Sequence, residues 1–391
     1  MDFGLNDEQR LFRQTLREFV DREIVPVARE WEREGRYPTE IVAGMRDLGL
    51  FGLVIPEEYG GLGADNVSFA LTFEEISRGW MGVAGILGSH SVSSWMLAHH
   101  GTEEQKRRYL PELATGERRT GIALTEPGAG TDLQGITTVA KRDGGGDDAD
   151  YIVNGTKMWI TNARHADPLP VLVKTDPAAS PAHRGMSILL VEASSEGFEV
   201  TADIGKLGYK GTESCEVVLT DVRVPASQLL GGVEGRGLQQ ALSALETGRI
   251  NIAARSVGVA QRAYDEALSY ARERTAFGGP IGDFQAIQLR LAEMAVALQS
   301  ARLMTYWAAS RMDEGVRMDT ESGMAKIVAS EAALSCAMDA MRIHGGYGYS
   351  TEFEVERLYR DAPLMSIGEG TNDVLRTVVA KSLLAGKAVI S

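Results

Sequence analysis

Cysteine and histidine are scarce in this chain of 391 residues, which contains two cysteines and six histidines. Cys215 and Cys336 stand far apart, and neither they nor His90, His99 and His100 show the spacing of metal ligands. Two isolated thiols are typical of a reducing compartment. We therefore expect a cytoplasmic protein with buried, unbridged cysteines and no metal site.

Positive charge and long apolar runs are also lacking. The chain has 40 Lys and Arg against 54 Asp and Glu, a formal net charge of −14, so we expect no nucleic-acid partner. No apolar run approaches the roughly 20 residues of a membrane span, and the charged N-terminus lacks the apolar core of a signal peptide. We expect no membrane partner, whereas an anionic small ligand needs only a local basic pocket.

What the chain does contain is helical periodicity on both sides of a strand-like block. Apolar residues recur at three- and four-residue steps in residues 1–120 and 232–391, and short β-branched runs separated by turn residues fill 121–231. A chain of this length exceeds one compact core. We predict a mainly α protein with an inserted antiparallel β domain: an N-terminal all-α domain, a middle β-barrel and a C-terminal four-helix bundle.

Four local signals make this layout specific. Asn154–Gly155 between apolar runs predicts a two-residue hairpin turn, and residues 122–125 are typical of a strand. Helical periodicity over 66–79 and 84–100 predicts two separate helices. Thr371 can cap the last apolar helical run of the chain.

One carboxylate has an unusual setting. Glu369 lies between Gly368 and Gly370 and is followed by Thr371, which places it on a tight loop just before a helix. From such a loop a side chain can project into a cleft, although a solvated loop acid has the same local sequence.

Three other stretches have the chemistry of a ligand site. Residues 123–132 combine glycines and hydroxyls after a strand-like run, which lets a ligand approach the main chain closely, but they lack the Gly-Lys-Ser/Thr ending of a P-loop. Trp159 near Thr161 can stack on a planar ring or belong to the core. Arg274, at the end of a long helix, can cap that helix or bind a pyrophosphate.

Together these motifs resemble the acyl-CoA dehydrogenase family over essentially the whole chain, with residues 123–135 and 345–361 similar to its two signatures. The resemblance implies that family's fold, a helical domain, a β-barrel and a four-helix bundle. It also implies an FAD cofactor and an oligomer that shares its FAD sites, usually a homotetramer built as a dimer of dimers.

The same resemblance assigns residues to the FAD site. The contacts expected with the flavin and diphosphate of the same subunit are Ile122, Leu124, Thr125, Gly130, Thr131, Trp159 and Thr161. Those expected with a neighbouring subunit's FAD or its adenosine end are Arg274, Phe277, Gln285, Arg342, Gly345 and Gly346. Thr371 and Asp373 complete the set near the pyrophosphate.

Glu369 matches the family's catalytic base in its Glu-Gly-Thr motif. The other position that some members use for the base, just before Arg249, is here Gly248. The resemblance implies that Glu369 takes the α-proton of an acyl-CoA thioester while the β-hydride passes to flavin N5, giving a trans-2-enoyl-CoA. Burial is expected to raise the pKa of this carboxyl towards neutrality. The expected substrate contacts are Thr131, Arg249, Gly368 and Gly370.

The substrate is the point on which the sequence departs from its relatives. Gly368 stands where a tyrosine is usual, and the missing ring predicts space for a short or branched acyl group. Members that take dicarboxylic chains carry an arginine in the segment matching 82–92, which has none here, so a distal carboxylate is not expected.

An electron-transfer flavoprotein is the acceptor that the resemblance implies, within fatty acid metabolism. The alternatives are a flavin-dependent acyl-CoA oxidase, an acyl-carrier-protein-linked dehydrogenase of secondary metabolism on the same fold, and a non-catalytic helical scaffold.

Overall fold

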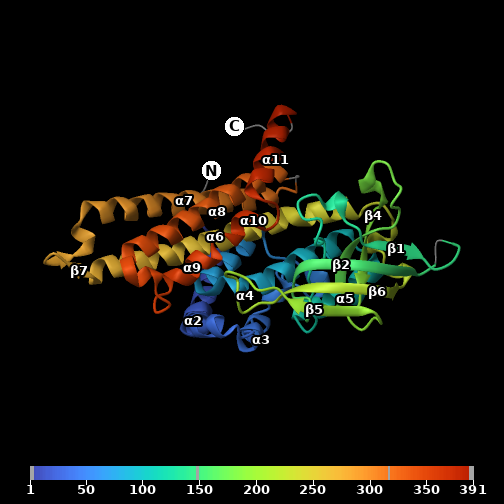
Figure 1. The fold of residues 1–391 in the computed structure, drawn as a ribbon, viewed down its shortest axis with the longest axis horizontal. Helices are drawn as coiled ribbons and strands as arrows, with labels where there is room; N and C mark the ends of the chain where they lie inside the picture. Colours follow the sequence, from blue (N-terminus) through green and yellow to red (C-terminus); the bar gives the residue numbers. More distant parts are fainter. Residues whose placement is uncertain (1–3, 147–148, 316–317, 387–391) are drawn as a thin grey trace.

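The computed structural model describes residues 4–146, 149–315 and 318–386. The molecule is elongated, with long helices filling one half and the strands gathered in the other (Figure 1). The glycine- and aspartate-rich stretch 143–148 predicts a hairpin tip, and its residues 147–148 lie outside the described part. The predicted class, mainly α with an inserted β domain, is confirmed.

Five helices form the N-terminal part. They are α1 (Asp7–Phe19), α2 (Val25–Glu34), α3 (Thr39–Asp47), α4 (Asn66–His100) and α5 (Glu103–Thr115). Asn6 caps α1 in a reciprocal capping box with Gln9, as its polar side chain allows. The two helices predicted between residues 66 and 100 are the two segments of α4, which are separated by a kink at Trp80, where a φ of −156° and a ψ of 110° lie outside the helical region.

The β domain is one six-stranded sheet in the order β4-β3-β1-β2-β6-β5. Its strands are β1 (Val139–Arg142), β2 (Tyr151–Thr161), β3 (Leu169–Lys174), β4 (Met186–Val191), β5 (Phe198–Asp203) and β6 (Ser214–Val224). Neighbouring strands run antiparallel except β1 and β3, which pair in parallel.

Two local predictions are wrong. Asn154 and Gly155 lie inside the continuous strand β2, where the register with β6 shifts, and form no hairpin turn. A Cβ on Gly155 would lie 2.3 Å from Oγ1 of Thr138, so the glycine permits a close approach at a bulge. Residues 122–125 form no strand, because only Ala123 bridges to Val171 and the rest runs as a loop.

The C-terminal half is the predicted four-helix bundle. It consists of α6 (Gly237–Glu273), α7 (Gln285–Met312), α8 (Asp319–His344) and α11 (Asn372–Leu384). The first three pack against one another, and α11 packs on α8. The short elements between them are β7 (Thr275–Ala276), β8 (Gly279–Pro280), α9 (Val355–Asp361) and α10 (Leu364–Ile367).

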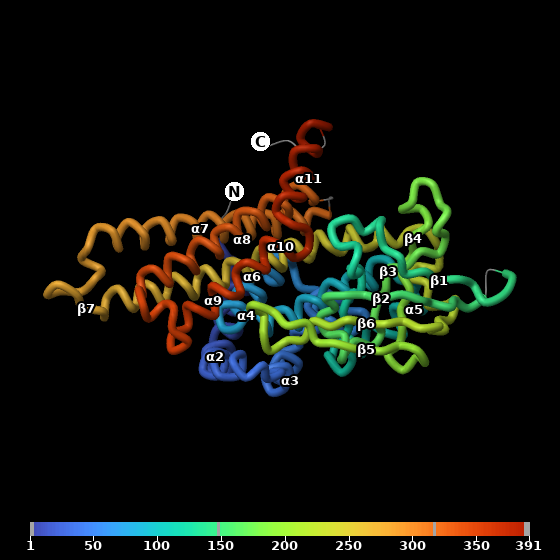
Figure 2. Tube along the Cα trace, viewed as in Figure 1, coloured from blue at the N-terminus to red at the C-terminus, as the bar shows by residue number. Residues whose placement is uncertain are grey.

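Helix α6 connects the two halves of the molecule. With 37 residues it is about 55 Å long, and it packs along α4 and α8 while also reaching β3 and β4 (Figure 2). Cys215 and Cys336 are both buried and free, as predicted. Among the described helices, none has both the length and the apolar character required to cross a bilayer. No group of three or more potential metal ligands is found in the described residues.

Candidate active site

The loop between α10 and α11 presents Glu369. Gly368 has extended backbone angles, whereas Glu369 has a φ of 54° and Gly370 one of 91°. The left-handed region is strained for a residue with a side chain, and such strain is often found at functional sites. Thr371 ends the turn, because its hydroxyl accepts the N–H of Val374 and caps α11 as predicted.

The Glu369 carboxylate lies against α6 at Gly248. A Cβ built on Gly248 would lie 1.5 Å from Oε2 and 2.5 Å from Cδ of Glu369. The carboxylate therefore occupies the space in which any side chain at residue 248 would begin. Residue 248 is the alternative position of the base, and the carboxylate of Glu369 occupies the space beside it. Only a glycine at residue 248 leaves room for this carboxylate.

The environment of Glu369 favours its neutral form. Its Oε2 is buried and has no hydrogen-bond partner among the described residues. Burial raises the pKa of Glu369 to about 7, against the opposing attraction of Arg255, Arg249 and Lys326. The predicted shift towards neutrality agrees with this value. A carboxyl that titrates near neutral pH can act as a base under ordinary conditions.

A buried lysine that sequence analysis missed fixes this loop. Lys326, on α8, is fully buried and donates from Nζ to the backbone oxygen of Gly370 at 2.8 Å and to Oδ1 of Asn372 at 2.9 Å. Asn372 also donates to Oγ of Ser330 at 3.0 Å. These hydrogen bonds attach Gly370 and Asn372, which follow Glu369 in the chain, to the helical bundle. The sequence offers only a weak signal, since Lys326 is one of several charged residues on the alanine-rich helix α8.

Arg249, which directly follows Gly248 on α6, is also buried. Its Nη1 lies 2.9 Å from Oδ1 of Asp319 at the start of α8. This ion pair holds Arg249 beside the carboxylate without bonding to it, so the residue adds positive potential to the site.

The predicted flavin contacts of the β domain lie together. The N–H of Met158 donates to the backbone oxygen of Thr125 at 2.9 Å, which places the loop 122–131 against β2. Trp159 has a φ of 65° and its side chain is 52% exposed, so it is not a core tryptophan. Thr161 ends the same strand, with its backbone next to Gly121. An exposed indole beside a hydroxyl-bearing loop is suited to a planar ring.

A buried ion pair anchors that loop and was not predicted. Lys157 Nζ lies 2.8 Å from Oε1 of Glu126, and Glu126 also accepts the N–H groups of Thr137 and Thr138. Burial alone would raise the pKa of Glu126, but Lys157 and these hydrogen bonds lower it to about 2. The ionised carboxylate thus holds both ends of a loop on which Gly130 and Thr131 are exposed.

The remaining predicted cofactor residues lie at the far end of the bundle. Phe277 is 98% exposed at the tip formed by β7 and β8, and Gln285 begins α7. The Arg274 guanidinium lies 5.7 Å from the ring centre of Tyr347, in the turn that contains Gly345 and Gly346. Figure 1 shows this tip and β2 in opposite halves of the molecule. The two groups of residues therefore lie in separate parts of the subunit.

Two expected contacts have ordinary surface surroundings. Arg342 bonds to Asp339 three residues earlier, and Asp373 pairs with Arg376 three residues later. Both arrangements are common on helix surfaces and by themselves indicate no ligand.

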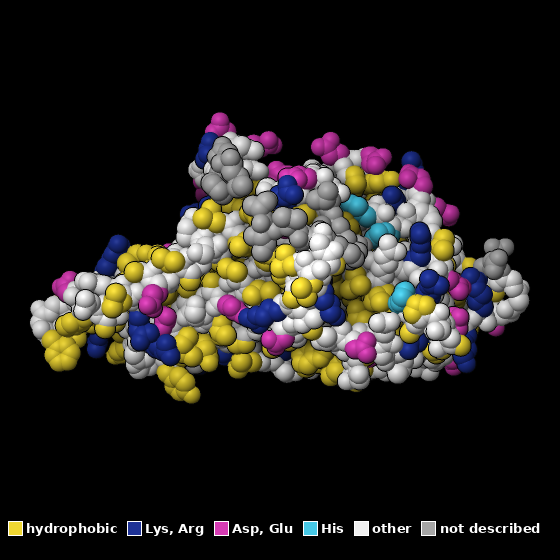
Figure 3. Space-filling model, turned by 90° about the horizontal axis from the view of Figure 1, so that it is seen from above, with side chains coloured by type: hydrophobic (Ala, Val, Ile, Leu, Met, Phe, Trp, Pro, Cys, Tyr) yellow, Lys and Arg dark blue, Asp and Glu magenta, His cyan; other side chains and the backbone are white. Residues whose placement is uncertain are grey.

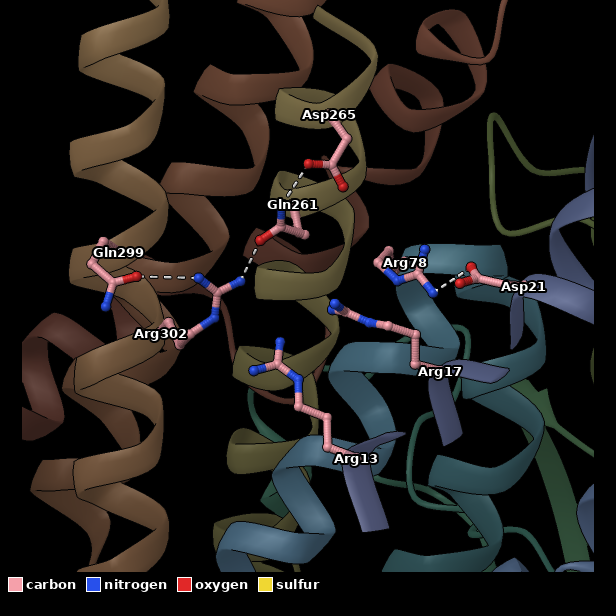
Figure 4. Close-up of a pocket in the computed structure, with 8 residues that line it drawn as sticks. All are labelled: Arg13, Arg17, Asp21, Arg78, Gln261, Asp265, Gln299 and Arg302. Atoms are coloured by element: carbon pink, nitrogen blue, oxygen red, sulfur yellow. Dashed lines mark hydrogen bonds and ion pairs between the residues drawn. The ribbon is translucent and has the colours of Figure 1, made fainter. Parts of the chain in front are cut away.

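A cavity of about 480 Å³ lies apart from these residues, among α1, α4, α6 and α7 (Figure 4). Its lining residues are Arg13, Arg17, Asp21, Arg78, Gln261, Asp265, Gln299 and Arg302. The arginines pair with Asp21 and with the buried carboxylates of Glu74 and Glu75. Four arginines face four carboxylates, counting Asp265, so this is a charge-balanced structural network.

Comparison with known proteins identifies the class. Family models match residues 6–117, 121–222 and 235–384, described respectively as the N-terminal, middle and C-terminal domains of acyl-CoA dehydrogenase. A fold and a buried carboxylate of this kind define a flavin-dependent oxidoreductase. The chain belongs to the acyl-CoA dehydrogenase family, whose members depend on FAD.

Individual relatives cover nearly the full chain. The 3-(aryl)acrylate reductase of Clostridium sporogenes is 41% identical, with 97% of this chain and 99% of the relative aligned. Subunit CarC of the caffeyl-CoA reductase-Etf complex of Acetobacterium woodii is 39% identical over 97% and 99%. The structure of butyryl-CoA dehydrogenase from Megasphaera elsdenii superposes with a TM-score of 0.94 at 36% identity, covering 98% and 100%.

Proposed function

We propose that the protein dehydrogenates an acyl-CoA thioester between its α- and β-carbons, with Glu369 as the base. The observation that carries this proposal is the Glu369 carboxylate itself, which is pressed against Gly248 with a buried, unpaired oxygen and a pKa of about 7. A buried carboxylate with no partner of its own is available to accept a substrate proton.

The chain's own residues supply the other requirements. FAD, when bound, supplies the acceptor for two electrons. Thr125, Trp159 and Thr161 provide an exposed ring and hydroxyls for its planar part, which fits the arrangement seen around β2. The N–H of Glu369 is a candidate donor to the thioester oxygen, and a fixed donor lowers the cost of charge that develops there. Lys326 keeps the loop of the base in place.

Space beside the base supports a short or branched acyl group. Gly368 has a φ of −65° and a ψ of 151°, which any residue can adopt. A Cβ there would lie 3.5 Å from the backbone oxygen of Leu364, an ordinary contact. The glycine is thus not required by the backbone, and the room it leaves supports a role in substrate choice.

An oligomer would bring the two groups of cofactor residues together. Three exposed leucine and valine side chains stand seven residues apart on α7, at Leu289, Val296 and Leu303, and Figure 3 shows hydrophobic side chains gathered on this face of the bundle. A seam of this spacing is suited to helix packing between subunits. We propose a homotetramer in which Arg274, Phe277 and Gln285 of one subunit approach the FAD of another.

The electron acceptor is proposed from a relative. The caffeyl-CoA reductase of Acetobacterium woodii is named as part of a complex with Etf. An electron-transfer flavoprotein is accordingly our proposed partner, acting with the protein in the cytoplasm.

The test is anaerobic mixing of the purified flavoprotein with butyryl-CoA, isovaleryl-CoA, hexanoyl-CoA and a crotonyl-CoA control, followed at the oxidised flavin absorbance. Bleaching by a saturated thioester, and its reversal by crotonyl-CoA, are expected. A protein that binds no flavin, or a flavin that no thioester bleaches, would refute the proposal.

The same preparation separates the alternatives. Rapid reoxidation by air identifies an oxidase, whereas slow reoxidation that an electron-transfer flavoprotein accelerates identifies a dehydrogenase. Bleaching by acyl-carrier-protein thioesters in preference to CoA thioesters would assign the protein to the carrier-linked class.

A further inference from the structure

One face of α6 carries buried polar groups that lack partners. Thr247, Asn251 and Arg255 stand at four-residue steps, so they lie on the same side of the helix. Their exposed fractions are 0%, 1% and 4%. Within the part of the chain that the structure describes, Thr247 Oγ1, both amide atoms of Asn251 and Arg255 Nε have no hydrogen-bond partner. Buried polar groups are normally paired, so a polar ligand that reached this row would be stabilised there.

Arg255 is the member of this row whose burial without a partner costs the most free energy. Its Nη2 contacts Sδ of Met81 at 2.6 Å, and its guanidinium carbon lies 5.0 Å from the ring centre of Tyr209. A thioether is only a weak acceptor. Among the described residues, no carboxylate lies within 4 Å of Arg255, in contrast to Arg249 with its Asp319. A buried charge without a counter-ion is strongly unfavourable unless something else completes it.

The arginine and the base share one buried region. Arg255 follows Gly248 by seven residues, about 10 Å along the helix axis. Helical side chains lean towards the N-terminus of their helix, which for Arg255 is the direction of Gly248. After burial, Arg255 is the largest influence on the pKa of Glu369. Its positive charge is therefore felt at the position where the α-carbon of a thioester must react.

We propose that Arg255 binds a second carboxylate at the far end of the acyl group, so that the substrates are CoA thioesters of short dicarboxylic acids. This rests on the proposed function. The planar guanidinium can hold a carboxylate through two parallel hydrogen bonds, and the amide of Asn251, one turn nearer the base, can donate a third. A purely hydrocarbon chain would leave all of these groups unpaired.

This inference reverses the expectation drawn from residues 82–92. That segment lacks an arginine, but the structure brings one from α6 to Met81, directly beside it. The expectation concerned α4 alone, whereas α4 and α6 pack along each other and either helix can supply the positive charge.

The test compares matched thioesters on the FAD-loaded protein. Glutaryl-CoA is paired with 5-methylhexanoyl-CoA, and adipyl-CoA with 6-methylheptanoyl-CoA, because an isopropyl end has nearly the shape of a carboxylate without its charge. Flavin bleaching gives kcat/KM for each. We expect the wild type to favour the dicarboxylic member of at least one pair by tenfold or more.

Variants show whether Arg255 causes that preference. Arg255→Gln is expected to lower the ratio of dicarboxylic to isosteric kcat/KM at least tenfold, and Arg255→Lys to retain part of it. Arg262→Gln is the matched control, since Arg262 lies two turns further along α6 and pairs with Glu266 at 2.8 Å. The control ratio should equal that of the wild type.

Two results would overturn the inference: a wild type that bleaches with the isosteres but not with the dicarboxylic thioesters, or a preference that survives Arg255→Gln. If Arg255 served only to lower the pKa of Glu369, Arg255→Gln would change kcat/KM equally for both members of a pair. If no thioester of any kind bleaches the flavin, the proposed function fails together with this inference. If the isosteric thioesters bleach the flavin and the dicarboxylic ones do not, only this inference fails.

Discussion

Adding a single methyl group at Gly248 tests the geometry of the base. In Gly248→Ala, the new Cβ would lie 1.5 Å from Oε2 of Glu369, whereas an ordinary contact needs about 3.4 Å. The carboxylate must therefore move by about 2 Å or rotate out of the site. Misplacement of a reacting group by about 1 Å can cost on the order of 100-fold in rate. We expect the rate of flavin bleaching to fall by at least 100-fold.

The variant should nevertheless fold. Alanine replaces glycine in a helix interior, where the change of propensity is favourable by about 1 kcal/mol. The flexible carboxylate can give way, so FAD content and the thermal midpoint should stay close to those of the wild type. Stopped-flow mixing with a thioester that bleaches the wild type measures the loss directly.

A second glycine provides the control. Gly323, inside α8, would place a Cβ 3.4 Å from Cγ2 of Val379, an ordinary packing distance. Gly323→Ala makes the same chemical change in the same bundle and should leave the bleaching rate unaltered. Bleaching by Gly248→Ala at the wild-type rate would show that the Glu369 carboxylate does not act from the position seen here.

Three further predictions follow from the same contacts. Lys326→Met should retain FAD, lower the bleaching rate by about 10- to 100-fold and raise the pKa of Glu369, because the lysine both fixes the loop and attracts the carboxylate. A titration of kcat/KM against pH measures both effects. An unchanged pKa of Glu369 would contradict this explanation. In the wild type, kcat/KM should rise with pH through about 7 as Glu369 ionises, and a rate that is flat from pH 6 to 8 would exclude it as the titrating base. Gly368→Tyr should slow isovaleryl-CoA more than butyryl-CoA by tenfold or more, and equal effects would remove Gly368 from substrate choice.

The ion network around the arginine-lined cavity gives a stability prediction. Glu75 is fully buried, with Arg13, Arg17 and Arg78 bonded to it. Burial by itself would raise its pKa, but the arginines lower it below the ordinary 4.5. Glu75→Gln should therefore cost about 3 kcal/mol near pH 7, measured by denaturant unfolding. The cost should shrink as the pH falls from 4.5 towards the lower pKa of the folded protein, because the unfolded wild-type chain then binds a proton at Glu75 that the folded protein does not; a cost that does not change with pH would contradict this account.

Much of the architecture could be predicted because it depends on local patterns. Apolar spacing predicted the long helices, and Thr371 was recognised as a helix cap from the residues around it. The hairpin predicted at Asn154–Gly155 is absent because pairing with the neighbouring strands keeps both residues inside β2. Thr138 lies so close to Gly155 that only glycine fits at this position. Pairing across a sheet is not visible in the local sequence.

The site was predictable only in part for the same reason. Glu369 is conspicuous because glycines flank it, and the motif around it is continuous in the sequence. Lys326 and Arg255 contribute through contacts with residues more than 40 positions away, at Gly370 and Met81. Each is one of several charged residues on its helix, and its role becomes interpretable only when the facing element is known.

The most direct test of the central claim is anaerobic flavin reduction in Glu369→Gln. The amide is nearly isosteric with the carboxyl and can lie in the same space at Gly248, so the protein should fold and retain FAD. With a thioester that bleaches the wild type within seconds, the variant is expected to reduce its flavin at least 1,000-fold more slowly, because the buried base is gone. Reduction of the variant's flavin at the wild-type rate would contradict the assignment of Glu369 as the base.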